Sequence, residues 1–372
     1  MKVLFITYHY LNGNGGGVFA SRAFINAFAE LSTEMTLLYP MKEGATPEHI
    51  APGIRAIPVW DKRSRLGKGL GLLTGRTNRF AIDGKVIPEE KFDVVVFDTS
   101  MVTHGLIDRF KASGARIITI HHNYQYEYFR DNSTFPLRIP TLFWSGRSER
   151  EAVLKSDLNL TLTPEDRNSL ITHYGGREEG IKVIGTFEYK RRPPLTEPCE
   201  AGKDNFLITG DLGAKQTVDS LLEWIDLYYP LLGESFPGSS LTLAGRSPSD
   251  ALLRKAAENG IKVIPSPEDM NPILERAKYY ICPVSVGGGI KLRVMDGLRY
   301  GLPVVSHKVS ARGYEAFQKA GVLLSYDDPA SFRRCLEKLK ALEPGRSEVI
   351  VLYESLFSFE SGKERIKKAL GL

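Results

Sequence analysis

The stretch Gly287–Ser306, GGGIKLRVMDGLRYGLPVVS, decides the fold of this chain of 372 residues. An apolar run at Tyr279–Pro283 precedes its three glycines, a helical pattern follows at Ile290–Tyr300, and a second apolar run closes it at Pro303–Ser306. Each apolar run is nearly continuous, which is typical of a strand covered on both faces of a parallel sheet. The stretch therefore predicts a right-handed strand–helix–strand unit.

The same alternation extends through most of the chain in two blocks. Residues 1–185 form the first and residues 205–347 the second, and a proline- and charge-rich linker, residues 186–204, separates them. Residues 348–372 add one or two helices. The strands predicted in the first block are Val3–His9, Met35–Tyr39, Asp93–Asp98, Arg116–His121, Leu158–Thr163 and Lys182–Ile184. We predict an α/β protein with two Rossmann-like, doubly wound parallel-sheet domains facing a cleft.

The composition is that of an ordinary soluble protein, with 42% apolar and 25% charged residues. It excludes a disordered chain, a collagen-like repeat and a small disulfide scaffold. No run approaches the roughly 18 apolar residues that span a bilayer. The three cysteines lie far apart without a CxxC pair, so we expect reduced thiols, a cytoplasmic protein and no metal site.

The positive charge is concentrated in one segment. Asp61–Phe80 holds six lysines and arginines against one aspartate, a formal charge of +5, which equals that of the whole chain. Leucines lie between the charges. The pattern therefore suits contact with the anionic inner face of a membrane or with an anionic lipid-linked acceptor. A solvated loop is the alternative. Nucleic acid is disfavoured, because the aromatic residues needed for base stacking are missing.

Two glycine-rich loops follow predicted strands. The first contains Gly15, Gly16 and Gly17 and precedes a helix, so its amides could contact an anion. Its spacing is neither that of a dinucleotide fingerprint nor that of a P-loop, and a turn without a ligand is the alternative.

The second loop, Gly287, Gly288 and Gly289, precedes Lys291 in the first turn and Asp296 in the second turn of a predicted helix. Amides and an ammonium suit a diphosphate, and a carboxylate suits ribose hydroxyls. Alternatively, Lys291 and Arg293 are solvated helix charges paired with Asp296.

This second segment closely resembles the donor-binding segment of the retaining glycosyltransferases of family 4 (glycosyl transferases group 1), which have the GT-B fold. Gly301–Val305 matches the family's G-x-P-V-V sequence. Asp296 stands at the second of two family glutamates, whose role is to hold the nucleotide ribose, whereas the first falls on Gly288. That first carboxylate touches the transferred sugar, so its role is absent here or supplied by another residue. Related G-x-G-I-K loops use the lysine and the amides, which fits Lys291.

The resemblance extends to neighbouring strand ends and to the tail. The family's arginine after the first donor-domain strand is Asp211 here, and its lysine falls on Gln216, beside Lys215. Arg246 could supply the missing phosphate-facing charge. The last helix resembles the family's tail, which crosses back to the N-terminal domain. The implied donor-binding residues are Gly15, Gly16, Gly17, Lys215, Arg246, Gly287, Gly288, Gly289, Ile290 and Asp296.

The resemblance also implies a catalytic set of His122, His121 and Lys291. In family relatives a histidine after the strand Arg116–Ile120 faces the donor sugar. Adjacent residues of a strand point to opposite faces, so we expect one of the two histidines to face the cleft and favour His122 slightly. A metal pair is disfavoured, because the two rings would diverge.

The implied function is transfer of a sugar from a nucleotide-sugar donor to a polysaccharide, lipopolysaccharide or other glycoconjugate acceptor. The resemblance implies retention of anomeric configuration, no metal and no cofactor, since the nucleotide sugar is a substrate. A nucleotide-sugar epimerase or a phosphorylase on the same fold is an alternative. A non-catalytic sugar-nucleotide binder is another, because Gly288 and Asp211 depart from the family pattern.

Overall fold

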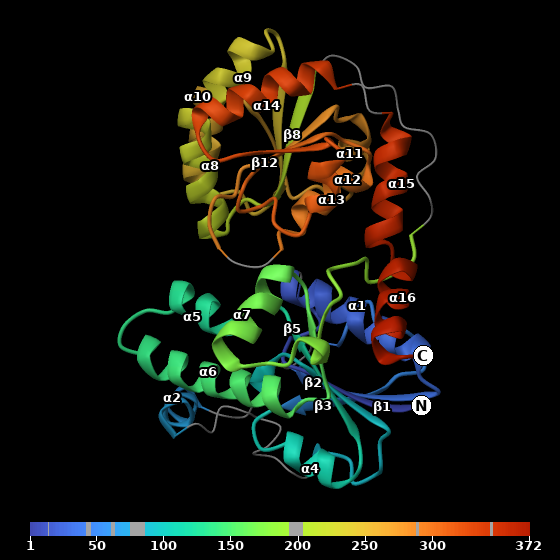
Figure 1. Cartoon of the computed structure of the whole chain (residues 1–372). Coiled ribbons are helices and arrows are strands. Elements are labelled where there is room, and N and C mark those ends of the chain that lie inside the picture. Colours follow the sequence, from blue (N-terminus) through green and yellow to red (C-terminus); the bar gives the residue numbers. More distant parts are fainter. Residues whose placement is uncertain are drawn as a thin grey trace. The chain divides into compact units, whose positions relative to one another are not determined.

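The computed structural model describes residues 1–13, 15–41, 46–60, 64–74, 86–192, 204–287, 290–342 and 345–372. The chain divides into two compact units (Figure 1). The first comprises Met1–Arg192 together with Phe357–Leu372, and the second comprises Pro193–Leu356.

The first unit is built on a seven-stranded parallel sheet in the order β3-β2-β1-β4-β5-β6-β7. Its strands are β1 (Lys2–Thr7), β2 (Glu34–Met41), β3 (Arg55–Trp60), β4 (Val94–Asp98), β5 (Arg116–His121), β6 (Leu158–Thr161) and β7 (Ile181–Val183). Its described helices are α1 (Gly16–Leu31), α2 (Arg65–Thr74), α4 (Ile107–Ala112), α5 (Gln125–Asn132), α6 (Arg138–Lys155), α7 (Pro164–Tyr174) and α16 (Phe359–Leu370), with short 3-10 turns at Ser100–Val102 and Glu178–Gly180.

Both faces of this sheet are covered. Val3 and Phe5 of β1 point into a core shared with α1 and α16, while Leu4 and Ile6 point into a core shared with α4 and α6. All four side chains are completely buried. Continuous apolar strands are therefore required here, as the sequence pattern indicates.

The second unit contains a six-stranded parallel sheet in the order β10-β9-β8-β11-β12-β13. Its strands are β8 (Asn205–Asp211), β9 (Ser240–Arg246), β10 (Lys262–Pro265), β11 (Tyr279–Cys282), β12 (Val304–His307) and β13 (Leu323–Tyr326). Its described helices are α8 (Lys215–Leu227), α9 (Tyr229–Ser235), α10 (Asp250–Glu258), α11 (Asn271–Arg276), α12 (Arg293–Arg299), α13 (Glu315–Lys319), α14 (Pro329–Ala341) and α15 (Arg346–Phe357). The predicted fold of two Rossmann-like parallel sheets is confirmed.

Each sheet has one point at which the strand order reverses. The chain leaves β1 toward one edge of the first sheet and returns to β4 on the other side, and β8 and β11 are related in the same way in the second sheet. Open α/β sheets bind ligands outside the carboxyl ends of the strands at such switch points. The residues that follow these four strands are therefore the first place to look for a site.

The boundaries between the two units differ from those expected from the sequence. The sequence pattern predicts a linker from residue 186 and the last helices from residue 348. Phe187 is completely buried in the core of the first unit, and the Glu188 amide donates to the carbonyl of Phe357. The α15 helix joins the second unit, because the Arg346 guanidinium donates to the carbonyl of Glu275. Residues 186–192 thus belong to the first unit.

One local prediction about the second glycine loop is wrong. The predicted helix at Ile290–Tyr300 begins only at Arg293, so Lys291 precedes the helix and Asp296 lies in its first turn. The carbonyl of Lys291 accepts a hydrogen bond from the Tyr314 hydroxyl at 2.9 Å, which fixes the backbone just before the helix.

Candidate functional site

A buried carboxylate occupies the switch point of the first sheet. Asp98 ends β4, and Thr7, which ends β1, is its register partner. The hydroxyls of Thr7 and Ser21 each donate to Asp98 Oδ2 at 2.5 Å. The other oxygen, Oδ1, lies 2.5 Å from His122 Nε2. Asp98 is completely buried, so these three groups take the place of water around its charge.

The surroundings keep this carboxylate ionised. Burial opposes the charged form of Asp98, but the charge of His122 and its hydrogen bond, together with His9 and Ser21, hold the pKa of the carboxyl below its usual range. In a neutral imidazole the nitrogen next to a carboxylate carries the proton. Nε2 of His122 is therefore the donor to Asp98, and its Nδ1 is left as an acceptor.

A second histidine lies beside this pair. The rings of His9 and His122 are 5.2 Å apart between centroids. A Cβ atom at Gly17 would lie 2.5 Å from His9 Cε1, so only glycine at this position of α1 leaves room for the ring. Among the described residues, neither His9 Nε2 nor His122 Nδ1 has a hydrogen-bond partner. Two buried ring nitrogens are thus available to a ligand or water at the switch point.

His9 gives the first unit a predicted acid sensitivity. Burial, helped by the charge of His122, lowers the pKa of His9 from 6.5 to about 4. Between these two pH values the unfolded chain binds a proton at His9 and the folded chain does not. The free energy of unfolding therefore falls as the pH drops from 6.5 to about 4. We expect His9→Gln to reduce the pH dependence of the urea midpoint for unfolding of the first unit. Hydrogen exchange of the backbone amides of β1 and β4 measures that unfolding. His104→Gln, at a histidine with a 39% exposed side chain, should leave the pH dependence unchanged; an equal effect of both variants would contradict the assignment.

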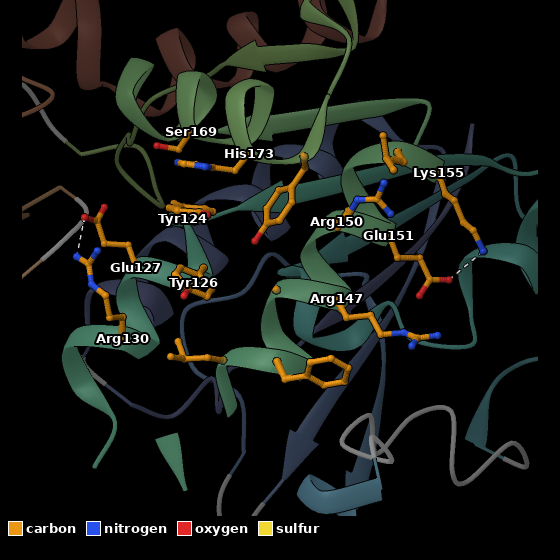
Figure 2. A pocket seen from close by; sticks show the side chains of 15 residues that line it. Tyr124, Tyr126, Glu127, Arg130, Arg147, Arg150, Glu151, Lys155, Ser169 and His173 are labelled. Carbon is orange, nitrogen blue, oxygen red and sulfur yellow. Dashed lines mark hydrogen bonds and ion pairs between the residues drawn. The ribbon is translucent and has the colours of Figure 1, made fainter. Parts of the chain in front are cut away.

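A cavity of about 1080 Å³ lies among α5, α6 and α7 of the same unit (Figure 2). Tyr124 and Tyr126 line it from the start of α5, Arg147 and Arg150 from α6, and Tyr174 from the end of α7. It was not predicted from the sequence.

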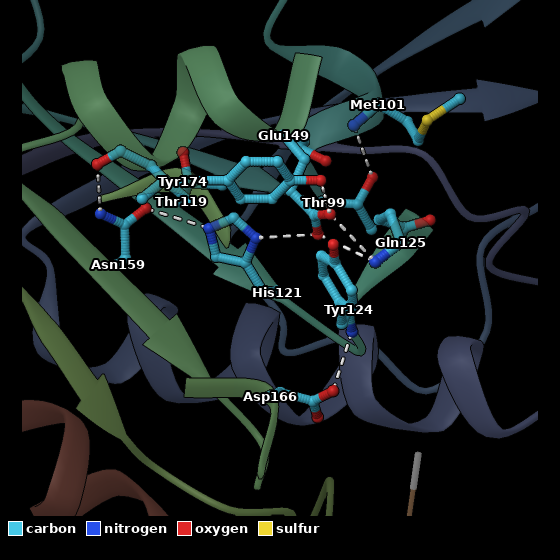
Figure 3. Close-up of polar contacts among 12 residues, drawn as sticks. Thr99, Met101, Thr119, His121, Tyr124, Gln125, Glu149, Asn159, Asp166 and Tyr174 are labelled. Atoms are coloured by element: carbon cyan, nitrogen blue, oxygen red, sulfur yellow. Dashed lines mark hydrogen bonds and ion pairs between the residues drawn. The ribbon is translucent and has the colours of Figure 1, made fainter. Parts of the chain in front are cut away.

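Tyr174 connects this cavity to the other histidine of the pair (Figure 3). Its hydroxyl donates to Glu149 at 3.1 Å, and the same carboxylate lies 3.6 Å from His121 Nδ1. His121 Nε2 lies 3.0 Å from Asn159 Oδ1. His121 and Glu149 are completely buried. The adjacent histidines therefore enter separate networks, His122 with Asp98 and His121 with Glu149.

Three cations gather at the switch point of the second sheet. Burial, with the charges of Arg293 and Arg312, lowers the pKa of Lys291. Lys291 Nζ lies 3.0 Å from where a Cβ atom of Gly287 would stand, beyond the end of β11. Arg293 donates to Thr217 of α8 at 3.1 Å. The positive charges repel one another, and this repulsion favours the binding of an anionic ligand among them.

Arg293 was missed as a site residue by the sequence interpretation. Its guanidinium lies over Gly210, where a Cβ atom would come within 2.8 Å of Cζ and where φ is +144°. Its Nη1 is buried and has no hydrogen-bond partner among the described residues. The available signal was its position after the glycine loop, but the helix start was placed three residues too early.

The remaining predicted donor residues lie in varied surroundings. Asp296 is exposed and accepts from Thr209 at 3.3 Å. Lys215 pairs with Asp219 at 2.7 Å, Arg246 lies 3.6 Å from Asp211, and Ile290 packs against Gly313. The start of α1 contains Gly16 and Gly17, with Gly15 as the residue before it. Gly288 and Gly289 lie outside the described residues.

In the parts of the chain that the structure describes, no group of three or more His, Cys, Asp and Glu side chains is placed to hold a metal ion. Likewise, none of the helices in those parts is both long and apolar enough to cross a bilayer.

Solved structures show which fold this chain shares. The lipopolysaccharide outer core galactosyltransferase WaaB is 13% identical with a TM-score of 0.68, and the match covers 100% of this chain and 99% of that one. Anabaena HepE in complex with UDP is 14% identical with a TM-score of 0.65, covering 100% of both chains. S. aureus TarM, solved with UDP, is 12% identical with a TM-score of 0.68, covering 100% of both. These likenesses establish the GT-B fold.

A sequence comparison matches part of the second unit to a known family. Residues 203–341 match the model of the family described as glycosyl transferases group 1. A curated relative, an uncharacterized 44.6 kDa protein in the cps region of Klebsiella pneumoniae, is 28% identical over 117 residues. That match covers 29% of this chain and 30% of the relative. The fold match therefore extends over the whole chain, whereas the family match is confined to residues 203–341.

Proposed function

We propose that this protein transfers a sugar from a nucleotide-sugar donor to a polysaccharide, lipopolysaccharide or other glycoconjugate acceptor, with retention of configuration and without a metal. The cation cluster of Lys291, Arg293 and Arg312 at the switch point of the second sheet carries this proposal. It lies within the segment that matches the group 1 glycosyltransferases.

In this proposal the second unit binds the donor. Lys291 and Arg293 hold the diphosphate, whose developing negative charge they stabilise as the sugar leaves. Asp296 accepts hydrogen bonds from the ribose hydroxyls, and its exposure at α12 leaves its carboxylate accessible. The leaving phosphate takes the proton of the acceptor hydroxyl. No dedicated base is then required in the second unit.

The first unit contributes His122. Because Asp98 fixes its tautomer, the Nδ1 atom can accept a hydrogen bond from a sugar hydroxyl, or donate one when the ring is protonated. We assign His122, rather than the completely buried His121, to the donor sugar. His121 then holds Glu149 and the loop after β5 in place.

A thermal-shift panel of nucleoside diphosphates and their sugars tests the proposal. A ligand present at 100 times its dissociation constant adds about 2.7 kcal/mol of stability, so at least one nucleotide should raise the melting temperature of the second unit. Product analysis then separates the alternatives. Transfer or hydrolysis supports the proposal, whereas an isomerised sugar nucleotide, a requirement for inorganic phosphate, or binding without turnover would replace it. No shift with any nucleotide would overturn it.

We further propose that α2 contacts an anionic membrane surface. Leu66 and Leu70 lie on one face of this helix and are 82% and 63% exposed. The surrounding basic segment Asp61–Phe80 carries the charge that anionic lipid attracts. Residues 61–63 and 75–80 of that segment lie outside the described residues.

The double variant Leu66→Glu/Leu70→Glu should bind phosphatidylglycerol vesicles at least about tenfold more weakly than the wild type, because two apolar side chains no longer enter the bilayer and two negative charges repel it. Vesicle co-sedimentation measures the effect. Val351→Glu, at a 69% exposed position of α15, is the matched control and should bind like the wild type. Unchanged binding of the double variant would leave α2 as a solvated helix.

A further inference from the structure

The cavity among α5, α6 and α7 has a distinctive balance of charge. Arg147 and Arg150 lie three residues apart on α6 and so share one face of it. Among the described residues neither has a carboxylate within ion-pair distance, and Arg147 lies instead over the ring of Trp144. The other cations of the cavity are neutralised: Arg130 by Glu127 and Lys155 by Glu151. Two guanidinium groups are therefore left for an anion.

The walls of the cavity are aromatic (Figure 2). Tyr124 stacks on His173 with a centroid separation of 5.2 Å and an interplanar angle of 6°, which holds the Tyr124 ring in a fixed plane. Tyr126 and Phe143 line the same cavity and are 39% and 59% exposed. Flat apolar ring faces of this kind suit the C–H face of a sugar ring, and a few placed charges then fix its orientation.

We propose that this cavity binds a sugar that carries a phosphate or a carboxylate. The planar guanidinium groups of Arg147 and Arg150 recognise the anion, since their paired donors match both phosphate and carboxylate oxygens. The aromatic walls hold the ring. The choice of a sugar rests on the proposed function, because the bound group is then one residue of an anionic acceptor glycan. The recognition of an anion rests only on the charges of the two arginines.

The position of Gly146 allows the cavity to be filled. A Cβ atom there would lie 3.6 Å from Tyr126 Cδ2 and 3.7 Å from the Tyr174 hydroxyl oxygen, which is ordinary contact. Gly146→Ala therefore fits, and it favours the helix by removing a glycine from the interior of α6. Gly146→Leu places further carbons in the space between these rings and should exclude a ligand.

The test measures the dissociation constants of glucose 6-phosphate, glucuronate, glucose and inorganic phosphate by NMR titration of the intact protein. We expect at least one charged sugar to bind on the order of tenfold or more tightly than glucose and than inorganic phosphate, and the tighter of the two identifies the anion. Arg147→Ala/Arg150→Ala and Gly146→Leu should each weaken that binding about tenfold or more, and Gly146→Ala should not.

Several outcomes would overturn the proposal: equal binding of glucose and the charged sugars, binding of phosphate as tight as that of the best sugar, no binding of either charged sugar, or no loss in the arginine double variant. That double variant decides the matter even if Gly146→Leu does not fold. Nucleotide binding, measured on the same samples, reports separately on the second unit. Its absence would remove the proposed transferase function, while the sugar titrations would still decide whether the cavity recognises an anion.

Discussion

Replacing Asp98 with asparagine should lower kcat for sugar transfer on the order of a hundredfold or more, because a misplaced proton on a participating histidine commonly costs this much. Thr7 and Ser21 both donate to Asp98 Oδ2, so the asparagine must keep its oxygen there. Its amide nitrogen then faces His122 Nε2, which changes from donor to acceptor. The proton moves to Nδ1, and the tautomer needed at the sugar is lost.

The affinity for the donor nucleotide should stay unchanged in this variant, since we propose that the nucleotide binds the second unit. A loss confined to kcat, with the nucleotide affinity kept, is the result expected if Asp98 positions His122 at the sugar. Asp108→Asn, at a carboxylate that is 69% exposed and paired with Lys155, is the control. Full activity in the Asp98 variant would show that His122 takes no part in transfer.

Replacing Arg293 with alanine should weaken binding of the donor nucleotide about tenfold to a hundredfold, which corresponds to the roughly 1.5–3 kcal/mol of a hydrogen bond to a charged group. The reason is the buried Nη1, whose partner we propose to be the diphosphate. Calorimetric titration with the nucleotide identified in the thermal-shift panel measures the effect. The free nucleoside should lose little affinity, because it lacks the phosphates.

The control for Arg293 is Arg254→Ala, which removes the same charge from an exposed position of α10. Lys215→Ala should lower affinity less than Arg293→Ala, because the side chain of Lys215 is 86% exposed and its ammonium already pairs with Asp219. Equal losses for the nucleotide and the nucleoside in the Arg293 variant would mean that the guanidinium supports the loop rather than binding phosphate.

Most of the architecture could be predicted from the sequence because parallel strands are continuous apolar runs. The exceptions are informative. The edge strand β3, Arg55–Trp60, was missed because Pro58 interrupts it, and proline is tolerated only at such edges. The strand β13, Leu323–Tyr326, was missed because Ser325 interrupts its apolar run. The start of α12 was misplaced because glycines and a lysine before a helix do not mark which residue begins it.

The candidate site could be predicted only where one segment of the sequence contains it. Lys291 and Asp296 follow a recognisable glycine loop, whereas Asp98 appeared only as the last residue of an apolar strand. Its importance comes from the neighbouring ends of β1 and β5, which bring Thr7 and His122 to it from distant parts of the chain. The arginine cavity was missed for the same reason, since three helices line it with no shared spacing.

The return of the last helix has a consequence for how the protein is made. Phe359, Ile366 and Leu370 of α16 complete the core that covers α1, yet the ribosome synthesises them after the entire second unit. The second unit is continuous and can fold as soon as it emerges, whereas the first must wait with part of its apolar surface uncovered. The nascent first unit is therefore the part of this protein that most needs protection by a chaperone.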